Sequence, residues 1–114
     1  LKLSKDGNDG LDFHQRLLLG ITVKINDKLL DIYTTHLSLS KKARKRTLPE
    51  IATFINKNIN EYSHETIGGI VMGDFNCEFD YDIEASKILP QYDIIDVWTT
   101  LGKCNDTIND IIKL

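Results

Sequence analysis

Residues 70–76, Ile-Val-Met-Gly-Asp-Phe-Asn, constrain the fold of this chain more than any other stretch. An apolar run with two glycines before it and one after it has the length and the punctuation of a short buried strand rather than a helix. In α/β sheets, functional groups gather at the carboxyl ends of such strands. Asp74 at this end can position or deprotonate a nucleophile beside a divalent ion, and Asn76 can donate to a phosphate oxygen. The stretch predicts an α/β fold with a candidate catalytic site.

The same residues have two other interpretations. Gly, Asp and Asn are common turn formers, so residues 73–76 are equally consistent with a simple turn. The alternate polar residues from Asp74 onward also match the start of a calcium-binding loop. We exclude that loop, because Phe79 stands where it requires glycine and Ala85 where it requires a bidentate glutamate.

Two strands joined by a tight turn are predicted upstream. Residues 17–25 alternate with the period of two that a strand requires, and residues 26–27, Asn-Asp, tolerate the positive φ of a hairpin turn. Residues 29–36 then form the returning strand, which ends at His36. If this strand lies parallel to the one that ends at Asp74, both deliver polar groups to one edge of the sheet. A histidine at a strand end is otherwise commonly a donor to a backbone carbonyl.

A helix is predicted between the hairpin and the last strand, because apolar residues recur at helical spacing over residues 48–59. Thr47 and Glu50 match a capping box, which places the helix start at Thr47. Alternatively, a helix that starts near Lys41 is kinked at Pro49. The order strand, strand, helix, strand predicts a parallel crossover.

The remaining segments give weaker patterns. We expect four features: a loop, a short helix ended by Pro90, a short and largely buried element, and a last segment that is a helix or a strand. They lie at residues 1–12, 82–89, 93–98 and 106–114, in that order.

Five of the six residues in 41–46 are basic, so this run is either a solvated helix face or a source of phosphate contacts. The whole chain carries a net charge of −3, which gives no global attraction to nucleic acid or to an anionic membrane. The two cysteines form no CxxC pair, so neither a thiolate zinc site nor a disulfide framework is indicated. His14 and His64 lack catalytic context and are expected at the surface.

A chain of 114 residues suits one domain, residues 1–114, and 41% hydrophobic with 27% charged residues is ordinary for a globular protein. No apolar run is long enough to cross a bilayer, and the first ten residues hold no signal-peptide core, so we expect a soluble chain. Leu1 is not an initiator methionine, which suggests a fragment or a processed product.

Taken together, several segments resemble the endonuclease/exonuclease/phosphatase superfamily, whose fold is DNase I-like. Their order and spacing match the middle section of that family across residues 13–98. The resemblance implies part of a four-layer α/β sandwich and a hydrolysis of phosphoesters that depends on Mg²⁺ or Mn²⁺. The substrate would be a nucleic acid, a phospholipid headgroup or a nucleotide. The resemblance rests on residues 16–19, 31–37, Arg44, Arg46, the helix with Ile51 and Ile55, residues 70–76 and residues 93–98.

The resemblance also implies roles for individual residues. Asp74 would orient or activate the attacking water and would contact the metal only indirectly. Asn76 would bind the scissile phosphate, and His36 would hydrogen-bond the non-bridging oxygens of that phosphate. Asp110 is a candidate for a further metal-binding aspartate of the family.

Two parts of the family pattern do not occur here. The family places an asparagine and a metal-binding glutamate before the position of Leu1, and it ends in a Ser-Asp-His sequence that this chain lacks. We therefore expect a fragment of a larger domain that has little or no phosphodiesterase activity by itself. Two alternatives are a non-catalytic binding module of the same fold and a nucleic-acid-binding domain that uses residues 41–46.

Overall fold

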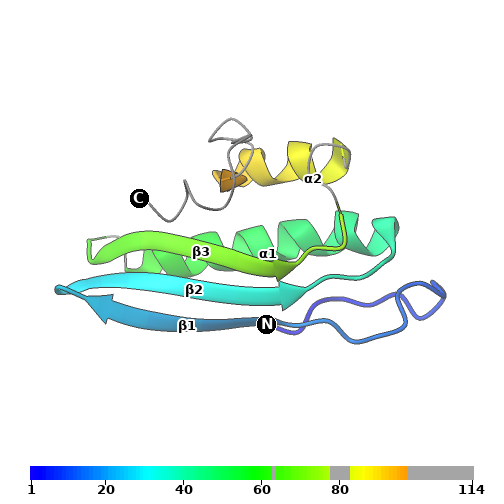
Figure 1. Ribbon diagram of the computed structural model, residues 1–114, viewed down its shortest axis with the longest axis horizontal. Coiled ribbons are helices and arrows are strands. Elements are labelled where there is room, and N and C mark those ends of the chain that lie inside the picture. Colours follow the sequence, from blue (N-terminus) through cyan, green and yellow to red (C-terminus); the bar gives the residue numbers. More distant parts are fainter. Residues whose placement is uncertain (63, 78–82, 98–114) are drawn as a thin grey trace, which may run out of the picture.

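The computed structural model describes residues 1–62, 64–77 and 83–97 (Figure 1). This part of the chain is a small α/β protein with a three-stranded mixed sheet, which confirms the predicted class. The segment 106–114, with Asp110, lies outside the described residues. The elements are β1 (Leu18–Ile25), β2 (Lys28–His36), α1 (Lys41–Glu61), β3 (Thr66–Asp74), α2 (Ile83–Ile88) and the 3₁₀ helix η1 (Leu89–Tyr92).

The strands lie in the order β1-β2-β3, with β1 antiparallel and β3 parallel to β2. Asn26 and Asp27 join β1 to β2 and have φ values of 47° and 65°, as two-residue hairpin turns with positive φ require. Helix α1 connects β2 to β3, which is the connection that a parallel pair needs. The predicted hairpin and the predicted parallel crossover are therefore both confirmed.

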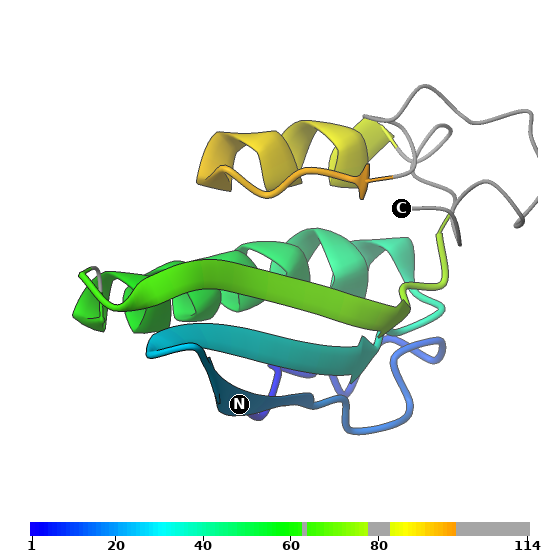
Figure 2. The same cartoon turned by 60° about the vertical axis from the view of Figure 1, so that its left-hand side comes forward.

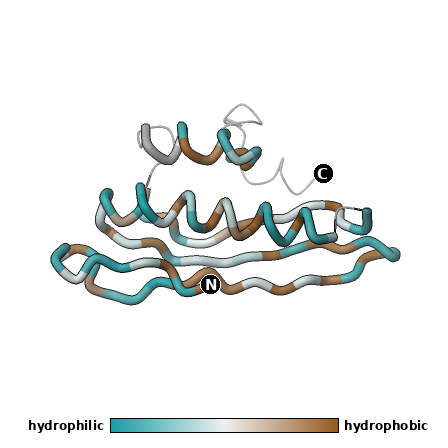
Figure 3. Tube along the Cα trace, turned by 180° about the vertical axis from the view of Figure 1, so that it is seen from behind, coloured by the Kyte–Doolittle hydropathy of each residue, from teal (hydrophilic) through white to brown (hydrophobic). Residues whose placement is uncertain are grey.

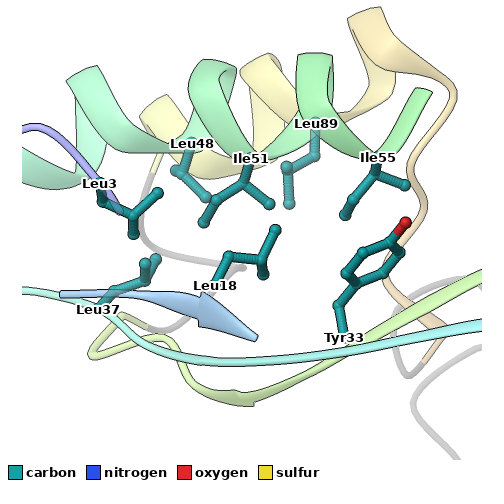
Figure 4. Close-up of a cluster of buried hydrophobic side chains, with 8 residues drawn as sticks. All are labelled: Leu3, Leu18, Tyr33, Leu37, Leu48, Ile51, Ile55 and Leu89. Carbon is teal, nitrogen blue, oxygen red and sulfur yellow. The ribbon is translucent and has the colours of Figure 1, made fainter. Parts of the chain in front are cut away.

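Helix α1 runs along one face of the sheet, and α2 and η1 pack against α1 (Figures 1 and 2). Its buried residues recur at intervals of three and four, so one stripe of the helix faces the strands. The core lies between this stripe and the sheet, and the N-terminal loop and η1 each add one leucine to it. Figure 4 shows the cluster: Leu3, Leu18, Tyr33, Leu37, Leu48, Ile51, Ile55 and Leu89.

The start of α1 corrects the capping-box prediction. Helix α1 begins at Lys41 with Ser40 as its N-cap, whose hydroxyl accepts a hydrogen bond from the Ala43 amide at 3.2 Å. The helix continues through Pro49, so the prediction of a start at Thr47 is wrong and the start near Lys41 is right. Proline inside a helix costs about 3 kcal/mol. Apolar burial on both sides of Pro49 offsets this cost.

The two residues of the predicted capping box have other partners. The Thr47 hydroxyl donates to the Ala43 carbonyl one turn earlier, at 2.9 Å. The Glu50 carboxylate accepts a hydrogen bond from the amide of Ser4, at 2.9 Å, and so anchors the N-terminal loop. The box failed because a serine that can cap lies seven residues upstream of Thr47.

The sheet has one covered face and one open face. Alternate side chains point to opposite faces, so Leu18, Tyr33 and Thr35 are buried beneath α1. In the described part of the chain no element covers the other face. Apolar residues recur along the strands (Figure 3). We call the exposed apolar side chains that face away from α1 the open face: Leu17, Leu19, Ile21, Ile25, Ile70 and Met72.

Two predictions of burial are corrected by this arrangement. Strand β3 was predicted to be buried, yet Ile70 and Met72 on its open face are exposed. The element over residues 93–98 was predicted to be largely buried, and its described part exposes Ile95 and Val97. An apolar sequence pattern records which side chains suit a core, but burial also requires a neighbouring layer.

None of the helices in the described ranges is both long and apolar enough to cross a membrane.

Candidate active site

His36 and Asp74 are the last paired residues of the parallel strands β2 and β3. The His36 Nε2 atom lies 3.6 Å from the Asp74 Oδ2 atom, and the two side chains are 59% and 64% exposed. Just beyond this pair, the Leu37 amide donates to the Asp74 carbonyl at 2.8 Å. The structure therefore brings together the two residues that the sequence placed at one sheet edge, and both are open to solvent.

Gly73 gives the backbone of β3 the conformation that leads to Asp74. Its φ is +136°, which side chains rarely adopt, and a Cβ atom here would lie 1.9 Å from the Thr35 carbonyl oxygen. Only glycine allows β3 to approach β2 this closely one residue before Asp74. The glycine of the Gly-Asp-Phe-Asn stretch is thus required by the local geometry.

Asn76 connects the ends of the two strands. Its backbone amide donates to Asp74 Oδ1 at 2.9 Å, which fixes the direction of that carboxylate. Its side-chain Nδ2 donates to the Leu37 carbonyl at 2.8 Å, next to His36. A side-chain amide has two hydrogens, so the second one can still donate to a phosphate. Asn76 thus holds the ends of β2 and β3 together.

Arg16 lies beside the site, although the sequence alone gave it no role. With His36 it lines an open hollow of about 330 Å³ beside the end of β2. The Arg16 Nε atom is buried and has no hydrogen-bond partner in the described part of the chain. A guanidinium suits planar anions such as phosphate. The only sequence signal was a basic residue immediately before the first predicted strand.

The metal ligands are incomplete. Among the described residues no three His, Cys, Asp or Glu side chains gather closely enough to hold a metal ion. Mg²⁺ usually binds one or two carboxylates together with water and the substrate phosphate. Asp110, the other candidate metal ligand, lies outside the described residues.

The basic run, residues 41–46, places fewer basic side chains at the surface than its composition suggested. Arg44 is buried, and its Nη1 donates to the carbonyls of Ser38 and Leu39 at 3.0 and 2.9 Å. Arg46 forms an ion pair with the buried Asp12 carboxylate, with Nη2 and Oδ2 2.7 Å apart. Arg44 thus holds the connection between β2 and α1, and Arg46 holds the N-terminal loop, which leaves three exposed lysines in residues 41–46.

His14 and His64 are exposed, as predicted. Neither side chain lies with the candidate site: His14 meets the Phe13 ring edge to face, and the His64 carbonyl accepts from Lys28.

Comparisons of the chain with family profiles, with curated proteins and with solved structures found no match.

Proposed function

We propose that this chain is part of a metal-dependent phosphoester hydrolase of the endonuclease/exonuclease/phosphatase type. The observation that carries the proposal is the His36–Asp74 pair, 3.6 Å apart at the carboxyl ends of adjacent parallel strands. Asn76 adds two contacts to this pair, since its amide bonds to Asp74 and its side chain bonds to the residue after His36.

The four polar residues supply distinct parts of the reaction. The Asp74 carboxylate would orient a water molecule and accept its proton. His36 and the second amide hydrogen of Asn76 would donate to the non-bridging oxygens of the phosphate, and Arg16 would place a positive charge nearby. Donors fixed in advance stabilise the charge that develops in the transition state. A divalent ion, when bound, would neutralise further phosphate charge.

The exposed apolar side chains of the open face support the proposal that this chain is part of a larger domain. Residues two apart on a strand point the same way, so His36 and Asp74 project from the same side of the sheet as the open face. Parallel strand pairs are normally covered on both faces, and two apolar sheet faces pack together in sandwiches. We propose that a second sheet of the full-length protein covers the open face and completes a four-layer sandwich. That layer would lie beside Asp74 and would supply the missing metal carboxylate.

A non-catalytic binding module of the same fold is the second candidate. It is favoured by one observation, namely that the described residues hold no group of three or more His, Cys, Asp or Glu side chains that could bind a metal ion. The nucleic-acid-binding alternative loses support, because Arg44 and Arg46 are committed to internal contacts.

Hydrolysis of bis(p-nitrophenyl) phosphate in the presence of Mg²⁺ or Mn²⁺ tests the proposal. We expect little or no turnover by the purified 114-residue chain and metal-dependent turnover by the full-length protein. Asp74→Asn should lower turnover by the full-length protein by about 10²-fold or more, since proton transfer is then lost. Asp27→Asn, which changes an exposed carboxylate in the hairpin turn, is the matched control.

Two results would contradict the proposal. Robust metal-dependent turnover by the 114-residue chain, abolished by Asp74→Asn, would show that the site is complete without a second sheet. Turnover by the full-length protein that Asp74→Asn leaves unchanged would show that the catalytic residues are elsewhere. A full-length protein that binds phosphate without turnover would identify the binding module.

A further inference from the structure

The N-terminal loop and the connection from β2 to α1 form one end of the molecule, where β2 and β3 finish (Figures 1 and 2). The Ser38 hydroxyl donates to the Leu11 carbonyl at 3.3 Å, and the Ser40 hydroxyl donates to the Asp9 carboxylate. The Leu3 amide also donates to the Arg16 carbonyl at 3.0 Å. We call this combined surface, residues 1–16 and 37–46, the basic end.

Charge in this protein is strongly segregated. The basic end contains eight basic and three acidic side chains, a net charge of +5. The whole chain carries −3, so all other residues together carry −8. The overall charge therefore conceals a local attraction for anionic surfaces.

The acidic side chains of the basic end are largely turned inward. Asp12 is buried beneath Arg46, and Asp9 accepts hydrogen bonds from the Ser40 hydroxyl and the Leu11 amide. The Asp6 carboxylate accepts from the Asn8 amide and stays exposed. Five lysines are exposed on the same end: Lys2, Lys5, Lys41, Lys42 and Lys45.

Three of the large apolar side chains on the basic end are more than half exposed. Leu11 is 63% exposed, Phe13 is 73% exposed and Leu39 is 62% exposed. Hydrogen bonds hold the backbones of Leu11 and Leu39, so these two side chains are exposed on an ordered backbone. The Lys5 Nζ atom lies 5.8 Å from the centre of the Phe13 ring, which puts charge and apolar surface in direct contact.

We propose that the basic end docks onto an anionic lipid bilayer. Leu11, Phe13 and Leu39 enter the boundary between headgroups and acyl chains, while Lys5, Lys41 and Lys42 contact lipid phosphates. Peripheral proteins combine these two contributions, buried apolar area and attraction to anionic lipid. A lipid surface fits better than a nucleic acid, because two of the three apolar side chains are aliphatic and gain little from bases or phosphates. The inference does not depend on the proposed hydrolysis, since none of these six residues belongs to the candidate site.

Flotation of the purified chain with lipid vesicles tests the proposal. We expect binding to phosphatidylcholine vesicles that contain about 30% phosphatidylserine, weak binding to pure phosphatidylcholine, and a loss of binding as salt rises. The triple variant Leu11→Ser, Phe13→Ser, Leu39→Ser should lower partitioning by about tenfold or more, because it removes the inserting side chains. Replacing Lys5, Lys41 and Lys42 with glutamine should have a similar effect.

The matched control is Leu19→Ser, Ile21→Ser, Met72→Ser, which removes as many exposed apolar side chains from the open face. Loss of vesicle binding in this control but not in the loop variant would overturn the proposal. Equal binding to the anionic vesicles and to the pure phosphatidylcholine vesicles would also overturn the proposal. Tight binding of a DNA duplex that the loop variant leaves unchanged, without vesicle binding, would assign the basic end to nucleic acid.

A second readout covers the case in which the triple variant misfolds, which circular dichroism would reveal. In the single variant Phe13→Trp, anionic vesicles should shift the added tryptophan fluorescence to shorter wavelength, as for a ring that leaves water. Unchanged fluorescence at vesicle concentrations that bind the protein would overturn the proposed orientation.

Discussion

The Asn76 side chain donates to the Leu37 carbonyl at 2.8 Å and thereby ties the end of β3 to the residue that follows His36. Asn76 has a φ of 51°, a left-handed conformation that asparagine tolerates better than most residues. Its backbone amide holds the Asp74 carboxylate at the same time. One residue thus sets the relative position of the two candidate catalytic side chains.

Two substitutions at Asn76 should differ in their cost. Asn76→Gly removes the Leu37 hydrogen bond and should lower the free energy of unfolding by about 1 kcal/mol. Asn76→Ala removes the same bond and also forces a side chain into positive φ, which adds about 1 kcal/mol. Urea denaturation of both variants measures the difference. Equal costs would mean that the left-handed conformation is not maintained in the protein.

Gly73→Ala should be among the most damaging small substitutions in the chain. The added Cβ would meet the Thr35 carbonyl oxygen at 1.9 Å, so β3 must separate from β2 or change its conformation. We expect a loss of about 3 kcal/mol or more in the free energy of unfolding, as for other strained backbone sites. Gly7→Ala is the control, because no atom lies within 4 Å of its Cβ position, and a similar loss there would contradict the steric explanation.

Protonation of the Asp12 carboxyl should account for part of the loss of unfolding free energy at acid pH. Burial raises the pKa of the Asp12 carboxyl, but hydrogen bonds from Asp6, Ser38 and Arg46 and the charge of Arg46 outweigh it and hold the pKa below its ordinary value. A lowered pKa contributes stability above the unfolded-state pKa of about 4, and this contribution is lost as pH falls through the folded-state value.

Asp12→Asn should therefore destabilise the protein near neutral pH by about 1 to 3 kcal/mol, since it leaves Arg46 without its charged partner. It should also flatten the decrease in unfolding free energy below about pH 4. Thermal denaturation between neutral and acid pH measures both effects. An Asp12→Asn variant with the same acid slope as the wild type would show that other carboxylates set the pH dependence.

Ser40 should be more important to α1 than the Thr47–Glu50 pair. Both Ser40→Ala and Ser40→Gly lose the hydrogen bond to Asp9, but Ser40→Ala should cost about 1 kcal/mol more than Ser40→Gly, because glycine is itself an acceptable N-cap. Glu50→Gln keeps an acceptor for the Ser4 amide and should be nearly neutral. Helix content and urea denaturation distinguish these cases. A larger loss in Glu50→Gln than in Ser40→Ala would restore the capping box as the helix start.

The parts of the fold that the sequence predicted are those set by local patterns. The period of two over residues 17–25, the Asn26–Asp27 turn and the apolar stripe of α1 each depend on neighbouring residues alone. The pairing of β2 with β3 followed from the crossover that α1 makes. These elements then placed His36 and Asp74 together.

Non-local features explain the predictions that failed. Both Ser40 and Thr47 suit the N-cap of α1. The helix takes Ser40 as its N-cap and continues through Pro49 because apolar burial on both sides of Pro49 offsets the cost of the proline. The exposure of Ile70 and Met72 depends on which layer covers β3, and a strand pattern carries no such information. The contacts that Asn76 makes with Leu37 and Asp74 depend on one positive φ, and the position of Arg16 depends on how the N-terminal loop folds back.

The mixed character of the sheet also sets an order of folding. Strands β1 and β2 are joined by two residues, so their pairing closes a very short loop. Pairing of His36 with Asp74 must instead bring together residues far apart in the chain, with all of α1 between them. Because closing a longer loop costs more entropy, the hairpin should form first and the β2–β3 pairing later. The candidate site would then assemble only after the hairpin and α1 are in place, which makes its geometry a late product of folding.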